Sequence, residues 1–449
     1  NIPSTDLCAT LLPFLKWATK ILLMGTSRSL PVLLPVIDGQ RWSCHSCGLC
    51  CRTLVGHLTA EERRRLDGQG WAQQLGVAPY VKIGRGWALN KQPDGACVFL
   101  DEQNRCKIHA KFGEADKPLA CRIFPFSVRP VRGAWQASLR FDCPSVTSSK
   151  GVALGGHRGW LGELVGRIEH DDESEDIADF HRGVRATVEE LRTLTARLSR
   201  WLSDGEKSMT DRLIGATRLT ATLYGAKLRK VRGPRFAELL DLLLEALPRD
   251  CATRPELPTA RQRAMLRQYA FAHAEHVSLA EMRSGLGGRW AKRWQQLHSA
   301  KQFLRGEGVV PNLPGFDTQV TFASVEAVGP AVERGEEIAD LVRRYLSARI
   351  EGRTVFGGGF YGWSVFAGLG ALWLLTAATG WLARYHAAVE RRTSISFEDF
   401  ALALGIVDRA ATRLPALGTM TEKARLSYLM GDDGLARLMM AYAALEPVP

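Results

Sequence analysis

The sequence lacks the motifs that mark several common classes of enzyme. It contains no Ser/His/Asp arrangement typical of a hydrolase triad, no HExxH motif, and no cysteine run spaced by three and then two residues as in radical enzymes. A second, separate Cys-x-x-Cys pair, which zinc ribbons and fingers usually carry, is also missing. No internal repeat of fixed length is present. The sequence therefore names no reaction by itself.

Acidic residues are scarce in the first third of the chain. Residues 1–150 contain 20 Lys or Arg against 11 Asp or Glu, which accounts for +9 of the net charge of +12. Cationic surroundings lower the pKa of cysteine thiols and offset the charge of a thiolate-bound metal. The sequence shows no basic helix with interleaved aromatic residues and no recognisable nucleic-acid-binding module, so nucleic acid is not an expected partner.

No secretory signal is visible, although the chain starts at Asn1 rather than at Met. The apolar fraction of 46% and the charged fraction of 24% are those of an ordinary soluble protein. Clustered cysteines in a cytoplasmic protein indicate metal or redox chemistry rather than disulfides. We therefore expect a cytoplasmic protein, with peripheral attachment to a membrane as an alternative.

Two apolar stretches are relevant to that alternative. Residues 7–24 carry leucines at roughly helical spacing and predict a helix that packs on the body or lies on a membrane. Residues 354–383 contain no charge, which is typical of a buried central helix or of a membrane span. We favour the buried helix. The glycines of Gly357-x-Gly359-x-x-Gly362 could admit an adenosyl cofactor, but close helix packing explains them better.

Eight of the ten cysteines lie between residues 44 and 143, and such clustering is hard to explain by packing. Thiolate sulfur is a soft donor, and four thiolates satisfy the geometry of zinc or of an iron–sulfur cluster. Spacings of two residues let a loop turn its sulfurs toward one centre, and Gly48 permits the tight backbone. We predict the following metal ligands: Cys44, Cys47, Cys50, Cys51, Cys97, Cys106, Cys121 and Cys143.

The type and number of centres stay open. The doublet Cys50-Cys51 indicates two centres, or one centre beside a free thiol, because adjacent side chains point in different directions. Cys143-Pro144 resembles the dipeptide that closes ferredoxin-type ligand runs, which favours one or two iron–sulfur clusters over Zn²⁺. Disulfides or unmetallated thiols are the third alternative. Three histidines are interpreted as neighbours of the metal loop rather than as ligands: His45, His57 and His109.

Hydrophobic periodicity predicts a mostly α protein, in which a small irregular α+β cysteine-rich metal-binding domain precedes a multi-helix domain. Within the small domain, we expect a capped helix at 59–66 and strands at 80–83, 86–89 and 96–100. Further helices are predicted at 177–202, 211–230, 236–247, 259–283, 338–350 and 396–414, followed by two short C-terminal helices. The predicted ranges are an apolar helical segment at 1–40, the metal-binding domain at 41–150, a helical domain at 151–305, a linker at 306–335, and a helical region at 336–449 that packs with 151–305.

Several motifs in one order suggest a family. They are Cys44-x-x-Cys47-Gly48-x-Cys50-Cys51-Arg52, Cys97-x-Phe99-Leu100, Cys106-x-Ile108-His109, and Lys117-Pro118-x-x-Cys121-Arg122-x-Phe124-Pro125. Over about residues 41–145 the sequence resembles the zinc- or iron-chelating cysteine-cluster family (YkgJ-type), which includes the flagellin lysine-N-methylases. His109 departs from the family, which usually has Tyr there.

The resemblance implies that the cysteines bind a metal. In the methylase branch it further implies methyl transfer from S-adenosylmethionine to protein lysines, so that the partner is a protein substrate. The alternative is a non-catalytic cysteine-cluster protein that serves electron transfer, metal handling or assembly with a protein partner.

Overall fold

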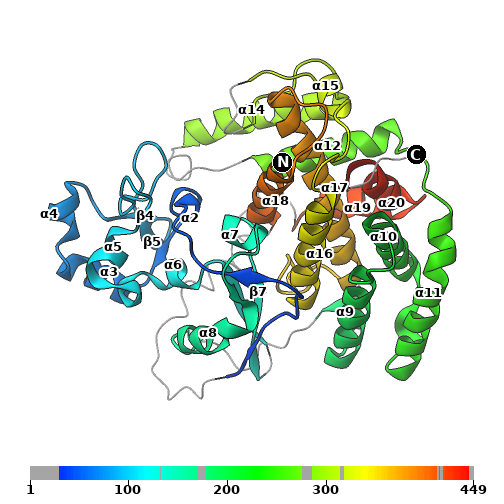
Figure 1. Ribbon diagram of the computed structural model, residues 1–449, viewed down its shortest axis with the longest axis horizontal. Coiled ribbons are helices and arrows are strands. Elements are labelled where there is room, and N and C mark those ends of the chain that lie inside the picture. Colours follow the sequence, from blue (N-terminus) through cyan, green and yellow to red (C-terminus); the bar gives the residue numbers. More distant parts are fainter. Residues whose placement is uncertain are drawn as a thin grey trace, which may run out of the picture.

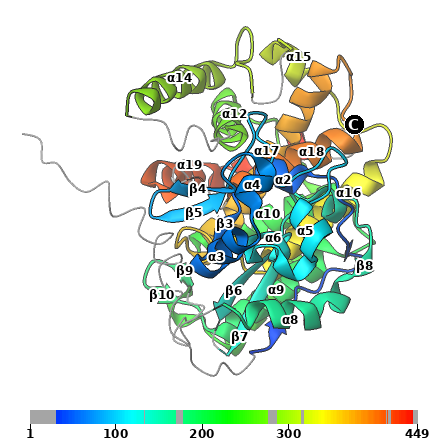
Figure 2. The same ribbon diagram turned by 90° about the vertical axis from the view of Figure 1, so that its left-hand side faces the viewer.

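The computed structural model describes residues 30–131, 133–168, 178–275, 286–313, 318–411, 414 and 418–443. The described chain is mostly α-helical, as predicted. Figure 1 shows a small lobe on the left and a larger helical body on the right, and in Figure 2 the lobe faces the viewer. The predicted helix at 7–24 lies outside the described residues.

The small lobe combines short helices with one antiparallel sheet of order β3-β5-β4. Its elements are α2 (Leu49–Thr53), β3 (His57–Leu58), α3 (Ala60–Gly68), α4 (Trp71–Leu75), β4 (Tyr80–Ile83), β5 (Gly86–Leu89), α5 (Lys107–Phe112), the 3-10 helix η1 (Glu114–Asp116) and α6 (Leu119–Ile123).

Local sequence signals account for most of this lobe. The Thr59 hydroxyl accepts a hydrogen bond from the Glu62 amide, and the Glu62 carboxylate accepts one from the Thr59 amide, which completes the predicted capping box of α3. The two predicted strands at 80–83 and 86–89 are confirmed. The strand predicted at 96–100 is wrong, because this segment turns back on itself through a hydrogen bond from the Leu100 amide to the Cys97 carbonyl.

The lobe has a small hydrophobic core of its own. The buried members of this cluster are Leu66, Trp71, Leu89, Ala96, Cys97, Val98, Phe99, Leu100 and Ile108. The thiol-bearing residues Cys51, Cys106 and Cys121 pack against it from the side. Because a core of this size stabilises a fold only weakly, small lobes usually need additional stabilisation, for example by a bound metal.

A second set of elements lies between the lobe and the body. They are β1 (Val32–Leu33), β2 (Arg41–Trp42), β6 (Phe126–Val131), β7 (Ala134–Leu139), α7 (Pro144–Thr147), β8 (Val152–Ala153), the 3-10 helix η2 (Leu154–His157) and α8 (Arg158–Val165). Strand β7 pairs antiparallel with β6 and parallel with β1. Residues 30–40 therefore correct the prediction of a helical segment over 1–40, because the amide of Trp135 and the edge of β7 hold this stretch as a strand.

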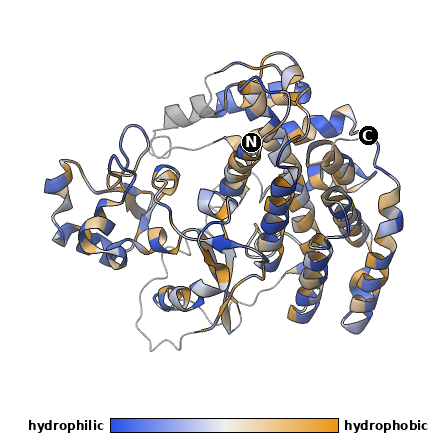
Figure 3. Ribbon diagram, in the orientation of Figure 1, coloured by the Kyte–Doolittle hydropathy of each residue, from blue (hydrophilic) through white to orange (hydrophobic). Residues whose placement is uncertain are grey.

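The helical body starts with a short hairpin. Its elements are β9 (Asp179–His181), β10 (Val184–Arg185), α9 (Val188–Leu202), α10 (Met209–Gly225), the 3-10 helix η3 (Leu228–Lys230), α11 (Pro234–Ala252), α12 (Ala260–Ala274), α14 (Leu286–Arg305), α15 (Phe322–Glu326), α16 (Gly335–Glu351), α17 (Val365–Val389), α18 (Phe397–Ala411), α19 (Met420–Met430), α20 (Gly434–Leu438) and the π-helical turn η5 (Met439–Ala443). Hydrophobic and hydrophilic residues alternate along the helices at the right of Figure 3, as expected for amphipathic packing.

The predicted helix at 177–202 is only partly correct. Gly183, with φ +77°, turns the chain between β9 and β10, and the Thr187 hydroxyl accepts from the Glu190 amide, so the helix starts at Val188. The predicted end of α11 at 247 is also wrong, because the helix continues through Pro248 to Ala252. The stripe predicted at 338–350 lies on α16 and is buried. The segment predicted as a linker at 306–335 contains the short helix α15.

Helix α17 occupies the centre of the body and contacts α10, α12, α18 and η5. In the described part of the chain it is the one helix long and apolar enough to cross a membrane, and 94% of its most apolar 18-residue stretch is buried inside the protein. A helix that is apolar on all sides is typical of a core. Its polar indole groups are satisfied within the body, for example by the 2.9 Å hydrogen bond from Trp373 Nε1 to Thr220 Oγ1.

Buried charges attach the chain around residue 143 to the body. Arg349 of α16 pairs with Asp408 of α18, and the Asp408 carboxylate also accepts a 2.7 Å hydrogen bond from the Phe141 amide. Arg344 of α16 donates to the carbonyls of Val146 and Thr147 at 3.0 and 2.8 Å. Removing one partner of such a buried set would leave the other unpaired, at a cost of about 3–5 kcal/mol.

Gly380 in α17 provides a test of this packing. A Cβ at this position would lie 1.9 Å from the Tyr442 carbonyl oxygen. We expect Gly380→Ala to lower the free energy of unfolding by more than about 2 kcal/mol. The matched control is Gly162→Ala in α8, where a Cβ meets nothing within 4 Å and helix propensity should raise stability by about 0.5–1 kcal/mol. Denaturant unfolding of both variants measures the difference, and equal stabilities would contradict the close packing of α17 against η5.

Candidate metal centre

Five of the eight predicted ligands come together beside the small core. Cys50 and Cys51 lie on α2, Cys97 lies in the turn after β5, Cys106 precedes α5, and Cys121 lies on α6. We call these five residues the five-cysteine group. They come from four segments of the chain, and their thiols lie close enough for the charge of one to act on the pKa of another.

Backbone geometry positions α2. Gly48 adopts φ +71° just before the helix, and a Cβ there would lie 2.8 Å from Asn104 Oδ1, so both the turn and the close approach require glycine. The predicted role of this glycine is thus confirmed. The Cys97 amide donates a 2.9 Å hydrogen bond to the Cys51 carbonyl, which brings the turn of Cys97 against α2.

Helix α6 is positioned by a residue that the sequence explained only as a helix cap. Glu62 Oε1 accepts a 2.6 Å hydrogen bond from the Leu119 amide at the start of α6, in addition to closing the capping box of α3. This contact holds Cys121 toward the core, where its sulfur would lie 3.5 Å from a Cβ on Gly56. No sequence signal distinguishes this second role, because it depends on a contact 57 residues away.

Burial and mutual repulsion raise the pKa of three of these thiols, Cys50, Cys97 and Cys121, when no metal is bound. Burial raises the pKa of Cys97 to about 11, and the charges of Cys106 and Cys50 act in the same direction. Burial also raises the pKa of Cys121, to which Cys97 contributes further. A hydrogen bond with the Cys51 thiol raises the pKa of Cys50, as does burial. A metal cation would reverse this balance by stabilising the thiolates.

Lys91 places a partly buried ammonium at this site, and the charge of Lys117 also acts on the thiols of Cys50 and Cys121; no local motif marks Lys91. The Lys91 Nζ donates a 2.6 Å hydrogen bond to the Cys51 carbonyl. Burial lowers the pKa of Lys91, whereas the nearby thiols, Cys97 first, raise it. An ammonium in this position compensates the negative charge that metal-bound thiolates accumulate.

The remaining predicted ligands lie in a second place. Cys143 precedes α7, is buried, and packs in the core of the helical body rather than in that of the lobe. Burial raises the pKa of Cys143 to about 11, and the charge of Cys47 adds to this effect. Cys44 and Cys47 are exposed on the loop before α2. His45 on this loop hydrogen-bonds Ser145 of α7 through Nδ1 at 3.0 Å, which brings the loop to the end of α7 that carries Cys143.

The donor set fits a thiophilic metal, although the side chains are not arranged as a coordination sphere. Every cysteine that the structure describes is a free thiol, so the disulfide alternative finds no support there. Across the same described residues, no three His, Cys, Asp or Glu side chains are placed to hold a metal ion. Soft sulfur donors beside a buried ammonium suit zinc or an iron–sulfur cluster, and the eight-residue ligand set stays a prediction.

Comparison with known families agrees with this donor chemistry. Residues 43–144 match the family model described as "Putative zinc- or iron-chelating domain" (CxxCxxCC). We call this segment the cysteine-cluster domain. The match confirms the family resemblance seen in the cysteine motifs and supports metal binding, without separating zinc from iron. It does not extend into the helices beyond residue 144. Neither the curated proteins nor the solved structures provide a match to the chain.

Outside the cysteine-cluster domain, three further residues have structural roles: Gly357, Gly362 and Cys251. Gly357 and Gly362 adopt φ of +58° and +69° in a turn that the amide of Gly357 closes on the Trp363 carbonyl, just before α17. Their positive φ values account for these glycines without a cofactor. The thiol of Cys251 lies 3.5 Å from the Asp211 carbonyl, where α11 contacts α10 in the helical body.

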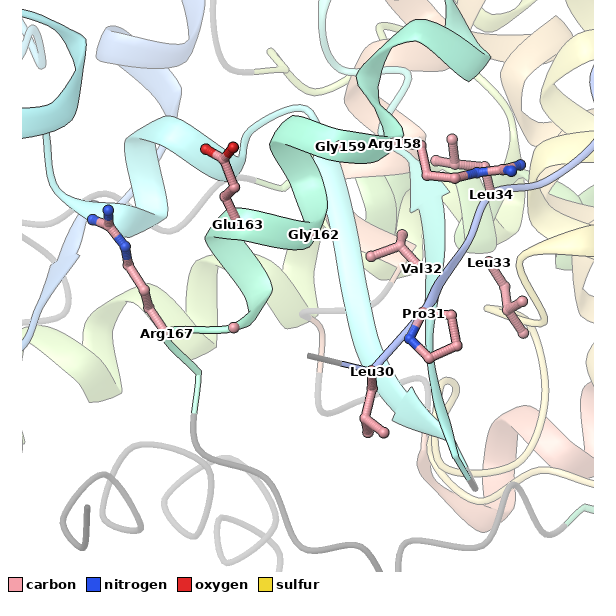
Figure 4. A pocket seen from close by; sticks show the side chains of 11 residues that line it. Leu30, Pro31, Val32, Leu33, Leu34, Arg158, Gly159, Gly162, Glu163 and Arg167 are labelled. Carbon is pink, nitrogen blue, oxygen red and sulfur yellow. The ribbon is translucent and has the colours of Figure 1, made fainter. Parts of the chain in front are cut away.

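A groove on the body is separate from both thiol groups. It has a volume of about 830 Å³ and lies between β1 and the glycine-bearing face of α8, as Figure 4 shows. Leu30, Val32 and Leu34 border one side, and Arg158, Glu163 and Arg167 are the charged residues of the other.

The raised thiol pKa values predict a pH dependence of metal binding. Since the pKa of Cys97 lies near 11, its thiol is protonated at pH 7 and must release a proton when it binds a metal. The apparent affinity for Zn²⁺ should therefore rise with pH between about 6 and 9, by up to about tenfold per pH unit for each proton released. Competition against a chelator at several pH values measures the slope. Cys97→Ser should make the slope shallower, and an affinity independent of pH would contradict the description of the thiols as protonated.

Proposed function

We propose that the cysteine-cluster domain holds a metal centre in the five-cysteine group, and that this centre is an iron–sulfur cluster. The observation that carries the proposal is that thiols from four separate segments lie near one another beside one small core and one partly buried ammonium. Packing alone does not require five thiols in one place, since any small apolar residue would fill the same volume.

The choice of iron–sulfur over zinc rests on the motifs. The two-residue spacing of Cys44, Cys47 and Cys50 and the dipeptide Cys143-Pro144 resemble ferredoxin-type runs, and a second Cys-x-x-Cys pair is lacking; of these cysteines, only Cys50 belongs to the five-cysteine group. Cys143 packs in the core of the body and the charge of Cys47 acts on its pKa, so these two thiols form a separate group that the proposed centre does not require. Four thiolates are enough for either type of site.

Metal analysis of protein purified without oxygen tests this proposal. We expect iron and acid-labile sulfide, with visible absorption of a cluster, and strong loss of all three in Cys121→Ser. The same substitution should also speed hydrogen exchange in the small lobe relative to α17, because a structural metal contributes directly to folding. Cys251→Ser, which removes another buried thiol from the body, is the matched control and should keep its metal.

Three outcomes would change the proposal in different ways. Zinc without sulfide would replace the iron–sulfur cluster by a tetrathiolate zinc site. Loss of metal in Cys251→Ser would show that the ligands have been assigned to the wrong part of the chain. Absence of any bound metal in protein purified without oxygen would overturn the metal centre altogether.

For the reaction, we propose methyl transfer from S-adenosylmethionine to lysines of a protein substrate. The support is the resemblance of residues 41–145 to a family that includes the flagellin lysine-N-methylases. The alternative, a non-catalytic role in electron transfer, metal handling or assembly with a protein partner, is consistent with the same thiols. Transfer of labelled methyl groups into lysate proteins by metal-loaded protein separates the two, and no incorporation would favour the non-catalytic role.

A further inference from the structure

Helix α14 carries apolar side chains on two opposite faces. Its inner face packs on the body: Phe303 is fully buried among Phe271, Phe322 and Trp381. The Phe303 carbonyl accepts a 3.1 Å hydrogen bond from Arg267 of α12. These contacts fix the rotation of the helix, and therefore also decide which side chains face solvent.

The outer face exposes large apolar residues that no described element covers. Trp294, Leu297 and Leu304 are 69%, 51% and 48% exposed. Spacings of three and seven residues place them on one side of an α-helix, and Phe303 lies about half a turn away from Trp294. A helix with apolar residues on one face needs one packing partner. The second apolar face of α14 is left without one in the described structure.

The charge of this helix has one sign. Its sequence contains five Lys or Arg and no Asp or Glu. Among the residues whose side chains are described, Arg293, Lys301 and Arg305 are exposed, and helical spacing places Lys301 and Arg305 on the same outer face as Trp294. Helix α14 is thus a basic helix with interleaved aromatic residues, contrary to the prediction that the chain has none. The net charge of +12 on the whole chain likewise favours a negatively charged partner.

We propose that the outer face of α14 lies on an anionic lipid bilayer. Long cationic side chains reach the lipid phosphates while leucine and tryptophan enter the boundary of the acyl chains. Figures 1 and 2 both show α14 along an outer edge of the body, where a flat surface can touch it. The helix of 20 residues is about 30 Å long, enough for an extended contact.

Lipid fits this face better than nucleic acid or an acidic protein does. Nucleic acid would use the cations and the tryptophan ring but would leave Leu297 and Leu304 in water. A protein partner would need an apolar groove lined with acidic side chains. An anionic bilayer offers negatively charged phosphates and apolar acyl chains over its whole surface. This surface is distinct from the thiol groups, so the proposal does not depend on the metal centre.

Sedimentation of the full chain with vesicles tests the proposal. Binding should be strong to vesicles of phosphatidylcholine with phosphatidylglycerol, weak to phosphatidylcholine alone, and reduced by salt. The double variant Trp294→Ser/Leu297→Ser should weaken binding to the anionic vesicles at least about tenfold. Lys301→Glu/Arg305→Glu should do the same while leaving the apolar residues in place.

The matched control is Leu257→Ser/Val332→Ser, which removes two other exposed apolar side chains, 72% and 81% exposed, from outside α14. It should bind vesicles as the unchanged protein does, and thermal unfolding should show that all variants are folded. Equal binding by the α14 variants, equal binding to neutral vesicles, or binding to duplex DNA in preference to vesicles would each overturn the proposal.

Discussion

The constraint on which the small lobe depends is the cost of burying several thiols beside one another with little apolar core to support them. Its hydrophobic cluster has only nine buried members, and one of them is Cys97. Burial and repulsion raise the pKa of Cys97 and Cys121 when no metal is bound. A metal would convert this unfavourable arrangement into one that stabilises the lobe, because it replaces repulsion between thiolates by bonds to a common cation.

The two thiol groups differ in their surroundings. The five-cysteine group lies in the lobe, where short helices and turns can adjust to a ligand. Cys143 lies in the core of the body, next to residues that Arg344, Arg349 and Asp408 hold through buried hydrogen bonds. A change at Cys143 would therefore act on helices α16 and α18, whereas a change at Cys121 would act first on the lobe.

In the helical body, apolar residues are buried on one helix and exposed on another. Helix α17 is apolar on all sides and is surrounded by other helices, with Gly380 allowing the chain at Tyr442 to approach. Helix α14 is apolar on two faces, and the part of the chain that the structure describes packs against only one of them. Its outer leucines and tryptophan cost solvation free energy in the free protein, which is why such patches usually mark an interaction surface.

Much of the local structure, and the kind of site, could be predicted from the sequence. Thr59 and Glu62 predict their helix, Gly48 predicts a tight turn, and the clustered cysteines indicate a soft metal, because each of these signals depends on residues near one another in the chain. The turn at 96–100 could not be predicted, since a short apolar run fits strand, turn and helix alike, and the hairpin at 179–185 has strands too short and too polar to show an alternating pattern. Only the tertiary structure decided that Cys143 separates from Cys121, that Lys91 lies among the thiols, and that α14 leaves an apolar face exposed. Each of these depends on contacts between segments far apart in the sequence, and such contacts arise from packing that no local pattern records.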